Sequence, residues 1–534
     1  MLQIQHLTIR HKKDLRVLLE DFALTLNPGD KAALIGEEGN GKSTLLQWLA
    51  APECIAPYAE AEGQRVLTGE RVGYLPQSLP QDQAQQTIYE FFCQEPMFWD
   101  YSPKELARQA AQLGLDPAIY YETRLLGSLS GGEKIKAQLL RLLLAQPTLL
   151  LLDEPSNDLD GETLRWLEEF LCRWEGTLLF VSHDETLLER VANKIIHLEQ
   201  LRRKTSCQAT TLAMGYGDYC AWREAQQERQ GRIARSEQRA AAQQEEKLRR
   251  IQQKVEHQLG SISRQDPHGG YLLKKKMRAV KALEHRYERE QARRTSMPER
   301  EEAIQLFFRD VPPLPAGKLV LELELPRLMT PDGSRLLAQD IRLRVQGPRK
   351  IGLTGRNGAG KSTLLACIRQ ALEQRPGIRA AYLPQDSSKL LPAEKTPVEF
   401  LAPSGRKEET EAARTLLGCL KFTPEEMEHP VLRLSGGQRS KLLLLWLTYS
   451  GANVLLLDEP TRSLSPLTGP VVREMLAAFP GAILSVSHDR LYLAQVCTDV
   501  YRLEPQGLRG GDPGGPPPAA AGTAAGLNAR RERR

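Results

Sequence analysis

The stretches GEEGNGKS (Gly36–Ser43) and GRNGAGKS (Gly355–Ser362) decide the fold of this chain. Each has the glycine, lysine and serine spacing of a phosphate-binding loop (P-loop), and each follows a short apolar run typical of a buried strand. The residues after each loop have the apolar spacing of an amphipathic helix. Glycines let backbone N–H groups close around phosphate oxygens, and the helix N-terminus adds positive potential. The sequence therefore predicts two nucleotide sites.

Three further motifs follow both loops, and their spacings are identical in the two copies. A serine in LSGGE or LSGGQ precedes an aspartate that ends an apolar run. A glutamate comes directly after that aspartate, and the histidine of an SHD sequence follows further along. These positions are Ser130, Asp153, Glu154 and His183 in the first copy, and Ser435, Asp458, Glu459 and His488 in the second. Equal offsets at two places indicate a duplicated α/β domain with a parallel sheet.

These residue types suit hydrolysis of a nucleoside triphosphate. Each loop lysine is expected to contact the β- and γ-phosphates, and Mg²⁺ is expected on Ser43 and Asp153 and on Ser362 and Asp458. The glutamate after each aspartate is expected to act as a general base; a carboxylate that is only solvated is the alternative. The predicted loop residues are Gly36, Gly39, Asn40, Gly41, Lys42, Ser43 and Thr44, then Gly355, Asn357, Gly358, Gly360, Lys361, Ser362 and Thr363.

Length and composition restrict the class of protein. At 534 residues the chain is too long for one core, and its 41% hydrophobic and 26% charged residues are ordinary for a globular protein. No apolar run reaches the roughly 18 residues of a membrane-spanning helix, and the N-terminus lacks the apolar stretch of a secretion signal. The eight cysteines contain no CxxC pair and are expected to be reduced thiols. We therefore expect a cytoplasmic protein.

The motifs divide the chain into two α/β domains separated by a different kind of segment. We place the first domain at 1–205, a basic helical linker at 206–317, the second domain at 318–508, and a disordered basic tail at 509–534. Residues 222–309 hold 21 Lys/Arg against 13 Asp/Glu, a net charge of +8, whereas the whole protein has +5. The positive charge is therefore concentrated in the linker.

The linker has the periodicity of two helices joined by a turn. Apolar residues recur at three- and four-residue steps on both sides of RQDPHGG, whose proline and glycines break a helix. They are Leu248, Ile251, Val255, Leu259 and Ile262, then Leu273, Met277, Val280, Leu283 and Tyr287. This pattern predicts an antiparallel coiled-coil hairpin with its tip near 261–281. A first helix over 222–260 is on the order of 55 Å long at ~1.5 Å per residue.

The tip of this hairpin is predicted to bind RNA. Six basic residues stand there against Asp266 alone, and such clusters suit phosphate backbones. They are Arg264, Lys274, Lys275, Lys276, Arg278 and Lys281. His268 and Tyr271 are candidates for stacking on exposed bases. A solvated coiled coil, whose lysines only keep it soluble, is the alternative.

The motif set resembles that of tandem ABC-type ATPases, and the resemblance covers both domains nearly end to end. It implies that the signature loop (LSGGE or LSGGQ) of each domain caps the nucleotide held by the other domain. Ser130, Gly131 and Gly132 then complete the site of Lys361, and Ser435, Gly436 and Gly437 that of Lys42. It also implies that Gln77 and Gln385 sense Mg²⁺ and water, and that His183 and His488 contact the γ-phosphate.

The chain departs from the family pattern in two places. SNDLD follows Glu154, whereas TRSLSP follows Glu459 and places Ser465 where the family has an aspartate. We therefore expect the two sites to differ in turnover. The aromatic residue that often stacks on adenine is not evident; His11 or Arg16 is the candidate in its place, so the preference for ATP rests on the resemblance.

Two such domains joined by a basic hairpin resemble the ABC-F family, which acts on ribosomes. The tip sequence, EPTRSLSPL and SHDRLYL are most similar to its antibiotic-resistance branch, which covers lincosamides, streptogramin A compounds and pleuromutilins. The resemblance implies a monomer that closes on ATP and Mg²⁺ and inserts the hairpin into the exit site of the 70S ribosome. The tip then disturbs the P-site tRNA and the peptidyl-transferase centre, so that bound drug leaves, and hydrolysis releases the factor.

Three alternatives remain open at this point. A housekeeping translation factor of the same family has the same domains without drug protection. The ATPase component of a membrane exporter has no use for the basic hairpin. A chromosome-maintenance ATPase uses such a hairpin to bind DNA.

Overall fold

A computed structural model of the chain describes residues 1–13, 15–201, 206–261, 271, 275–282, 285–287, 308, 311, 313–386, 390–420, 422–462 and 464–511. The chain forms two compact units, one comprising Met1–Tyr216 with Glu301–Arg534 and the other Gly217–Arg300. The first unit holds both motif sets. Within it we call residues 1–216 the first half and residues 313–511 the second half.

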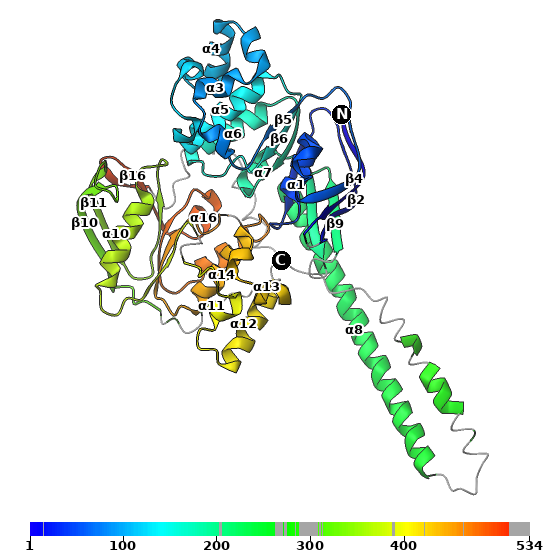
Figure 1. Cartoon of the computed structure of the whole chain (residues 1–534). Coiled ribbons are helices and arrows are strands. Elements are labelled where there is room, and N and C mark those ends of the chain that lie inside the picture. Colours follow the sequence, from blue (N-terminus) through cyan, green and yellow to red (C-terminus); the bar gives the residue numbers. More distant parts are fainter. Residues whose placement is uncertain are drawn as a thin grey trace, which may run out of the picture. The chain divides into compact units, whose positions relative to one another are not determined.

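Among the described residues, each half contains a six-stranded sheet, and the two sheets have the same strand order. Figure 1 shows strands and helices packed together in both halves. In the first half the order is β5 (Val72–Leu75), β6 (Leu149–Asp153), β7 (Thr177–Val181), β3 (Lys31–Gly36), β8 (Lys194–Leu201) and β9 (Ser206–Leu212). In the second it is β13 (Ala380–Leu383), β14 (Val454–Asp458), β15 (Ala482–Val486), β12 (Lys350–Thr354), β16 (Asp499–Glu504) and β17 (Gly507–Gly511). Only the last strand of each sheet runs antiparallel to its neighbour. The predicted α/β fold class is confirmed.

Helices surround both sheets. The first half contains α1 (Lys42–Ala50), α2 (Gln81–Ala84), α3 (Ile88–Cys93), α4 (Pro103–Gln112), α5 (Gly131–Leu144), α6 (Gly161–Arg173) and α7 (Glu185–Val191). The second half contains α10 (Lys361–Glu373), α11 (Pro397–Leu401), α12 (Lys407–Cys419), α13 (Pro424–Glu428), α14 (Gly436–Tyr449), α15 (Gly469–Ala477) and α16 (Arg490–Gln495). Short 3₁₀ turns lie at Pro52–Cys54, Pro96–Asp100, Pro117–Tyr121, Leu126–Ser128 and Val431–Arg433.

A small antiparallel sheet packs against the helix that follows each P-loop. In the first half its order is β2 (Val17–Leu26), β1 (Leu2–His11) and β4 (Ala59–Leu67), and in the second β10 (Leu319–Met329) pairs with β11 (Leu336–Gln346). Leucines of α1 and β3 share one core with β1 and β2, and those of α10 and β12 share another with β10 and β11. These cores hold both P-loop helices in place.

The central strands explain where the motifs meet. Every residue of β6, β7, β14 and β15 is buried. Strands covered on both faces have continuous apolar sequences, and apolar burial is the main favourable term in folding. Because β3, β6 and β7 are parallel neighbours, their carboxyl ends lie at one edge of the sheet. The P-loop, Asp153 and the segment leading to His183 all begin at that edge.

The domain boundaries differ from those predicted. The predicted end at 205 precedes β9, which pairs with β8 and belongs to the first sheet. In the second half the core includes buried Leu314, before the predicted start at 318, and β17 runs past 508. Edge strands were missed because their short, partly polar sequences carry weak periodicity. The rest of the predicted tail, 512–534, lies outside the described residues.

Helix α8 (Tyr216–Ser261) has 46 residues and starts before the predicted position 222. It is about 70 Å long at ~1.5 Å per residue. Its buried side chains include Ala234, Ala241, Leu248 and Val255, which recur at heptad spacing as in a coiled-coil seam. Ile251, predicted in the seam, is instead 47% exposed. The residue four positions after Leu248, Gln252, is half-buried. Gln252 therefore takes the seam position that was predicted for Ile251. Val280, near the end of the predicted tip, is also buried, whereas Ile262, Leu273 and Leu283 lie outside the described residues.

This seam predicts different effects of two neighbouring substitutions. Val255→Asp places a charge at a buried position, so we expect hydrogen-exchange protection of amides in 241–261 to fall about tenfold or more. Ile251→Asp is the matched control, and it should leave protection unchanged because Ile251 already faces solvent. Exchange followed by mass spectrometry measures both. Equal protection in the two variants contradicts the assigned seam.

Candidate active site

The first P-loop connects β3 to α1 in a tight turn. Gly41 has φ 85°, and a Cβ on Gly36 would lie 2.4 Å from the carbonyl oxygen of Leu198, so both positions require glycine. The Lys42 ammonium donates to the carbonyl oxygens of Gly36 and Glu37 at 2.8 and 2.9 Å. Burial lowers the pKa of Lys42, while four nearby carboxylates oppose that shift. The loop therefore holds a buried lysine whose partners are carbonyl groups.

The second P-loop repeats this arrangement. Lys361 donates to the carbonyl oxygens of Gly355 and Arg356 at 2.9 and 3.0 Å, and Gly360 before it has φ 97°. Burial lowers the pKa of Lys361, and the charges of Glu459, Asp160 and Asp458 oppose the shift. Asp160 belongs to the first half. A carboxylate of one half therefore acts on the lysine of the other.

In the first half the strand-end residues lie beside the P-loop helix. Ser43 Oγ donates to Asp153 Oδ1 at 3.1 Å. Burial raises the pKa of Asp153 to about 6, against the hydrogen bond from Ser43. Glu154 has φ 52°, and its backbone N–H donates to the carbonyl oxygen of Val181 at 3.0 Å. Its Oε1 lies 2.7 Å from Nε2 of His183. The predicted general base is therefore in direct contact with the histidine that is predicted to reach the γ-phosphate.

The corresponding contact in the second half is looser. Glu459 has φ 53° and donates its N–H to Val486, as its counterpart does to Val181. His488 donates its backbone N–H to Glu459 Oε2 at 3.3 Å, but its Nε2 is 3.8 Å from Oε1. Burial raises the pKa of Glu459 to about 8, and Asp458 adds to the shift. Burial also lowers the pKa of His488 to about 4, helped by the charge of Lys361. A cation beside Glu459 would favour its ionised form.

These residues fit a Mg²⁺–triphosphate. The hydroxyl of Ser43 and the carboxylate of Asp153 are oxygen ligands of the kind Mg²⁺ prefers. Glu154 Oε2 and His183 Nδ1 are buried and form no hydrogen bond within the described part of the chain. They can therefore bind a water or a phosphate oxygen without losing a protein partner. The N-termini of α1 and α10 add the N–H groups that phosphates require.

Each signature serine begins a helix. Ser130 Oγ accepts from Glu133 N–H at 3.3 Å, and Ser130 N–H donates to the Glu133 carboxylate at 2.9 Å. Ser435 and Gln438 form the same pair of hydrogen bonds, at 3.3 and 2.9 Å. These are capping boxes, which satisfy backbone groups at the starts of α5 and α14. The serines therefore have a structural role besides the predicted nucleotide contact.

The structure brings the second signature loop to the first P-loop. The backbone N–H of Gly437 donates to the Glu38 carboxylate in a short hydrogen bond, and Lys441 Nζ lies 3.1 Å from Glu37 Oε1. Gly437 is in the first turn of α14, where the N-terminus attracts anions. Glu38 therefore occupies a position suited to a phosphate. Its counterpart in the second P-loop is the neutral Asn357.

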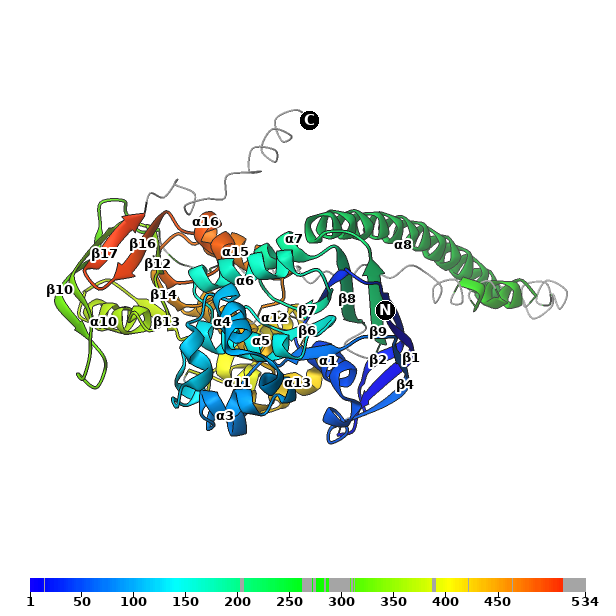
Figure 2. The ribbon, with the colours of Figure 1, turned by 90° about the horizontal axis from the view of Figure 1, so that it is seen from above.

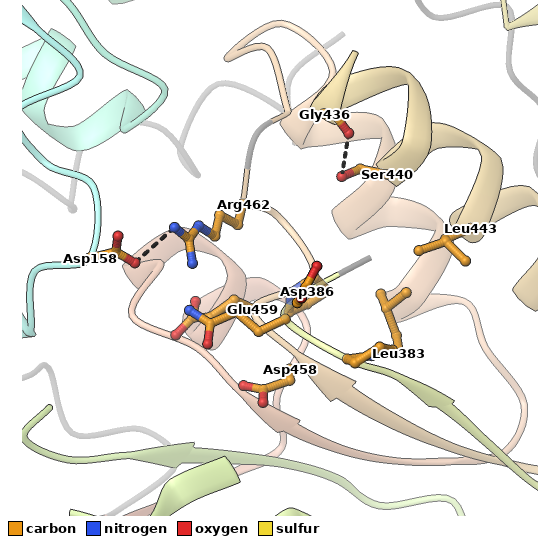
Figure 3. Close-up of a pocket in the computed structure, with 12 residues that line it drawn as sticks. Asp158, Leu383, Asp386, Gly436, Ser440, Leu443, Asp458, Glu459 and Arg462 are labelled. Atoms are coloured by element: carbon orange, nitrogen blue, oxygen red, sulfur yellow. Dashed lines mark hydrogen bonds and ion pairs between the residues drawn. The ribbon is translucent and has the colours of Figure 1, made fainter. Parts of the chain in front are cut away.

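Contact with the second P-loop comes from a different segment. Asn357 Nδ2 donates to the carbonyl oxygen of Asp158 at 2.5 Å, and Arg462 Nη2 lies 2.8 Å from Asp158 Oδ1 (Figure 3). The loop after Glu154 thus lies against both the P-loop and the TRSLSP segment of the second half. Within the described residues, Ser130–Gly132 form no hydrogen bond with this P-loop. The contact predicted for this signature loop is with the nucleotide, so it stays a prediction.

A cavity of about 520 Å³ lies at this junction. Residues of both halves line it, including Lys361, Ser362, Thr363, Gln385, Asp458, Glu459 and His488 from the second half and Asn157, Asp158 and His183 from the first. The predicted lysine, serine, glutamine, aspartate, glutamate and histidine of the second copy therefore share one cavity. Gln77, which follows β5, is exposed and forms no hydrogen bond among the described residues.

The second half has Ser465 at the position that Asp160 occupies in the first half, and this difference has a structural consequence. Asp160 caps α6 by accepting from Thr163 N–H at 3.0 Å, and its charge acts on Lys361 and His488. Ser465 is buried, accepts from Leu467 N–H at 3.3 Å and carries no charge. The site of Lys361 thus receives an acidic group that the site of Lys42 lacks. This difference supports the prediction of unequal turnover.

The two candidates for adenine contact lie in different surroundings. Arg16 Nη2 donates to the carbonyl oxygen of Gly39 at 3.0 Å, so its guanidinium lies on the first P-loop. The ring centroid of His11 lies 6.4 Å from that of Tyr58. Arg16 is therefore the better placed of the two.

The predicted RNA-binding residues are partly described. Five of them belong to the described part of the linker and have exposed side chains, as a binding role requires: Tyr271, Lys275, Lys276, Arg278 and Lys281. Arg264, His268 and Lys274 lie outside the described residues.

Sequence reasoning missed Glu37, Glu38, Asp158 and Arg462. The acidic pair in GEEGN was a visible signal, because carboxylates are unusual in a loop that binds phosphates. The partners of that pair lie in the other half of the chain, at Gly437 and Lys441. No local pattern indicates partners so distant in sequence.

Known proteins share this organisation. The ABC transporter family model matches residues 19–157 and 338–462. The tylosin resistance ATP-binding protein TlrC of Streptomyces fradiae is 30% identical to this chain, over 90% of it and 94% of TlrC. The chain belongs to the ABC-F family of tandem ABC ATPases. The energy-dependent translational throttle protein EttA of Escherichia coli K12 is 29% identical, over 92% of this chain and 90% of EttA.

A solved structure has the same fold. The archaeal ribosome recycling factor aABCE1, crystallised with the ribosomal stalk protein aP1, matches 95% of this ABC-F chain with a TM-score of 0.55 and 18% identity, over 90% of its own chain. As an ABC-F member the protein is an ATPase, and its two ABC domains bind ATP. None of the described helices is long and apolar enough to cross a membrane.

The acidic pair predicts that the first site binds ATP more weakly than its sequence pattern indicates. In a Lys361→Ala background, Glu38→Asn should lower the Kd for Mg²⁺–ATP about fivefold, because a carboxylate no longer repels the phosphates or occupies the start of α14. The mirror variant Asn357→Glu, in a Lys42→Ala background, should raise the Kd of the second site. Titration with a fluorescent ATP analogue measures both constants. An unchanged Kd in both variants contradicts this role of Glu38.

Proposed function

We propose that this ABC-F ATPase acts on the 70S ribosome in the cytoplasm, as a monomer whose two halves bind ATP between them. The observation that carries the proposal is the unit Gly217–Arg300, a basic helical insertion between two ATPase halves. Exposed lysines among the described residues of its predicted tip suit contact with rRNA and with the P-site tRNA. Among its relatives, EttA is named for translational control and TlrC for tylosin resistance.

In the proposed cycle the two P-loop lysines hold the phosphates of two ATP molecules. Mg²⁺ supplies positive charge to the phosphate oxygens, and the serine and aspartate of each site would hold it. Binding draws the halves together and sets the hairpin in the exit site, where its tip acts on the tRNA and the peptidyl-transferase centre. Glu154 and Glu459 then orient the attacking waters, and hydrolysis releases the protein from the ribosome.

The finer part of the proposal is antibiotic resistance by target protection. Similarity of the tip and of the TRSLSP segment to the resistance branch supports it, as does the relative TlrC at 30% identity. EttA, at 29% identity over a similar length, supports a housekeeping role in translation equally well. Drug sensitivity therefore decides between these two functions.

A variant that binds ATP but does not hydrolyse it tests whether the protein binds ribosomes. Protein carrying Glu154→Gln and Glu459→Gln should bind ATP without hydrolysing it, so we expect it to sediment with 70S ribosomes only when ATP is present. Adding Lys275→Glu, Lys276→Glu and Lys281→Glu should abolish sedimentation, because these side chains are exposed and basic.

The control for charge reversal is Arg406→Glu with Lys407→Glu, an exposed basic pair on the second half. This variant should still sediment with ribosomes. If the trapped protein stays at the top of the gradient with ATP, the ribosomal function is wrong. Retention on DNA instead would favour the chromosome-maintenance alternative.

Expression in a drug-sensitive strain tests the resistance branch. We expect the wild-type protein to raise the minimum inhibitory concentration at least about fourfold for a lincosamide, a streptogramin A, a pleuromutilin or tylosin. The Glu154→Gln/Glu459→Gln protein should give no increase. If no class shows a change while trapping on ribosomes succeeds, the protein is a housekeeping factor.

A further inference from the structure

Helices α6, α7, α15 and α16 lie on one side of the ATPase (Figure 2). Four charged side chains on these helices join the two halves. Glu185 on α7 accepts two hydrogen bonds from the guanidinium of Arg473 on α15, at 2.6 and 3.1 Å. Glu168 on α6 accepts from Arg490 on α16 at 3.4 Å, and a second, shorter bond joins the same two groups. Each ion pair therefore crosses from one half to the other.

The four positions are equivalent in pairs. The shift along the chain that aligns Asp153 with Asp458 also aligns Glu168 with Arg473 and Glu185 with Arg490. Each ion pair joins a residue of the first equivalent pair to a residue of the second. Exchange of the halves thus converts one ion pair into the other. Only the signs are unequal, because both carboxylates belong to the first half and both guanidinium groups to the second.

Neighbouring residues continue the pattern. Arg190 Nη1 lies 2.5 Å from Glu168 within the first half, and Gln495 accepts from Arg473 Nε at 2.7 Å within the second. The same shift along the chain aligns Arg190 with Gln495. Each central side chain, Glu168 or Arg473, therefore has one partner in its own half and one across the junction.

The signs of these four charges matter because the side chains are largely buried. The exposed fractions are 0% for Glu168, 4% for Arg473, 14% for Glu185 and 24% for Arg490. Removing one partner of such a pair leaves a buried charge without compensation, which is strongly unfavourable. Two first halves placed in this arrangement would bring Glu168 against Glu185, and two second halves would bring Arg473 against Arg490. Like halves would therefore repel at a place with little solvent to screen them.

We propose that Glu168, Glu185, Arg473 and Arg490 form a charge code that pairs each first half with a second half and rejects like halves. The partner that fits this surface is the other half of the same chain. A duplicated protein needs such a code, because its halves retain the same fold and the same junction. The code concerns assembly of the ATPase and holds whether or not the protein acts on ribosomes.

Exchanging the residue sets between equivalent positions tests this code in the full-length protein. One variant carries Glu168→Arg, Glu185→Arg and Arg190→Gln, so that both halves are basic at the junction. A second carries Arg473→Glu, Arg490→Glu and Gln495→Arg, so that both are acidic. A third carries all six changes and restores opposite signs with the halves reversed.

We expect each three-residue variant to lose ATPase activity at least about tenfold and the six-residue variant to recover to within about threefold of the parent. A neutral control, Glu168→Gln with Glu185→Gln, should lose less activity than the basic variant, because it removes attraction without adding repulsion. An equal loss would show that the residues act by shape alone, which overturns the proposal. The proposal is also overturned if the three-residue variants keep an ATPase activity within twofold of the parent.

Mixing the two three-residue variants tests the proposal even if the six-residue variant folds poorly. The basic and acidic variants have complementary junctions, so an equimolar mixture should form a 1:1 complex of about twice the 59.9 kDa chain mass and regain ATPase activity. Light scattering after size-exclusion chromatography measures the mass, and each variant alone should remain at the mass of one chain. A mixture of monomers without restored activity overturns the proposal.

Discussion

Burial of short parallel strands between helices is the constraint on which both ATPase halves depend. β6 and β7 in the first half and β14 and β15 in the second are buried along their whole length. Apolar burial on both faces fixes the strand order, and the strand order fixes which loops leave the same edge. Lys42, Asp153 and His183, which are far apart in the sequence, meet for this reason. The chemistry of each site therefore follows from the apolar runs as much as from the polar motifs.

The two duplicated halves have similar folds, but the charged residues at their nucleotide sites differ. The first P-loop carries Glu37 and Glu38 against the second signature loop, whereas the second P-loop meets the loop after Glu154. Asp160 reaches the site of Lys361, and its counterpart Ser465 is neutral. Electrostatic interactions are strong where water is excluded, so a few such exchanges change a site without changing its fold. The two nucleotide sites of this ABC-F protein are therefore equivalent in backbone and unequal in charge.

The sequence predicted those features of the fold and the site that local patterns encode. P-loop glycines and strand-end acids occur at the expected places because each depends on residues close in the chain. The seam of α8 was only partly predicted: Val255 and Leu248 are buried, but Ile251 faces solvent, since apolar character alone does not fix the rotation of a long helix. β9 was missed because an edge strand has one neighbour and needs less apolar character. The roles assigned to the tip remain predictions.

The sequence by itself determined the duplicated α/β fold, the two phosphate-binding loops, and a basic helical segment between them. These depend on periodicity, glycine conformation and charge composition, all of which are readable along the chain. Only the tertiary structure decided which loop meets which: Glu38 with Gly437, Asn357 with Asp158, and Glu185 with Arg473. Each of these contacts joins a residue of one half to a residue of the other. They arise from packing of the folded halves against each other, and no local pattern contains that information.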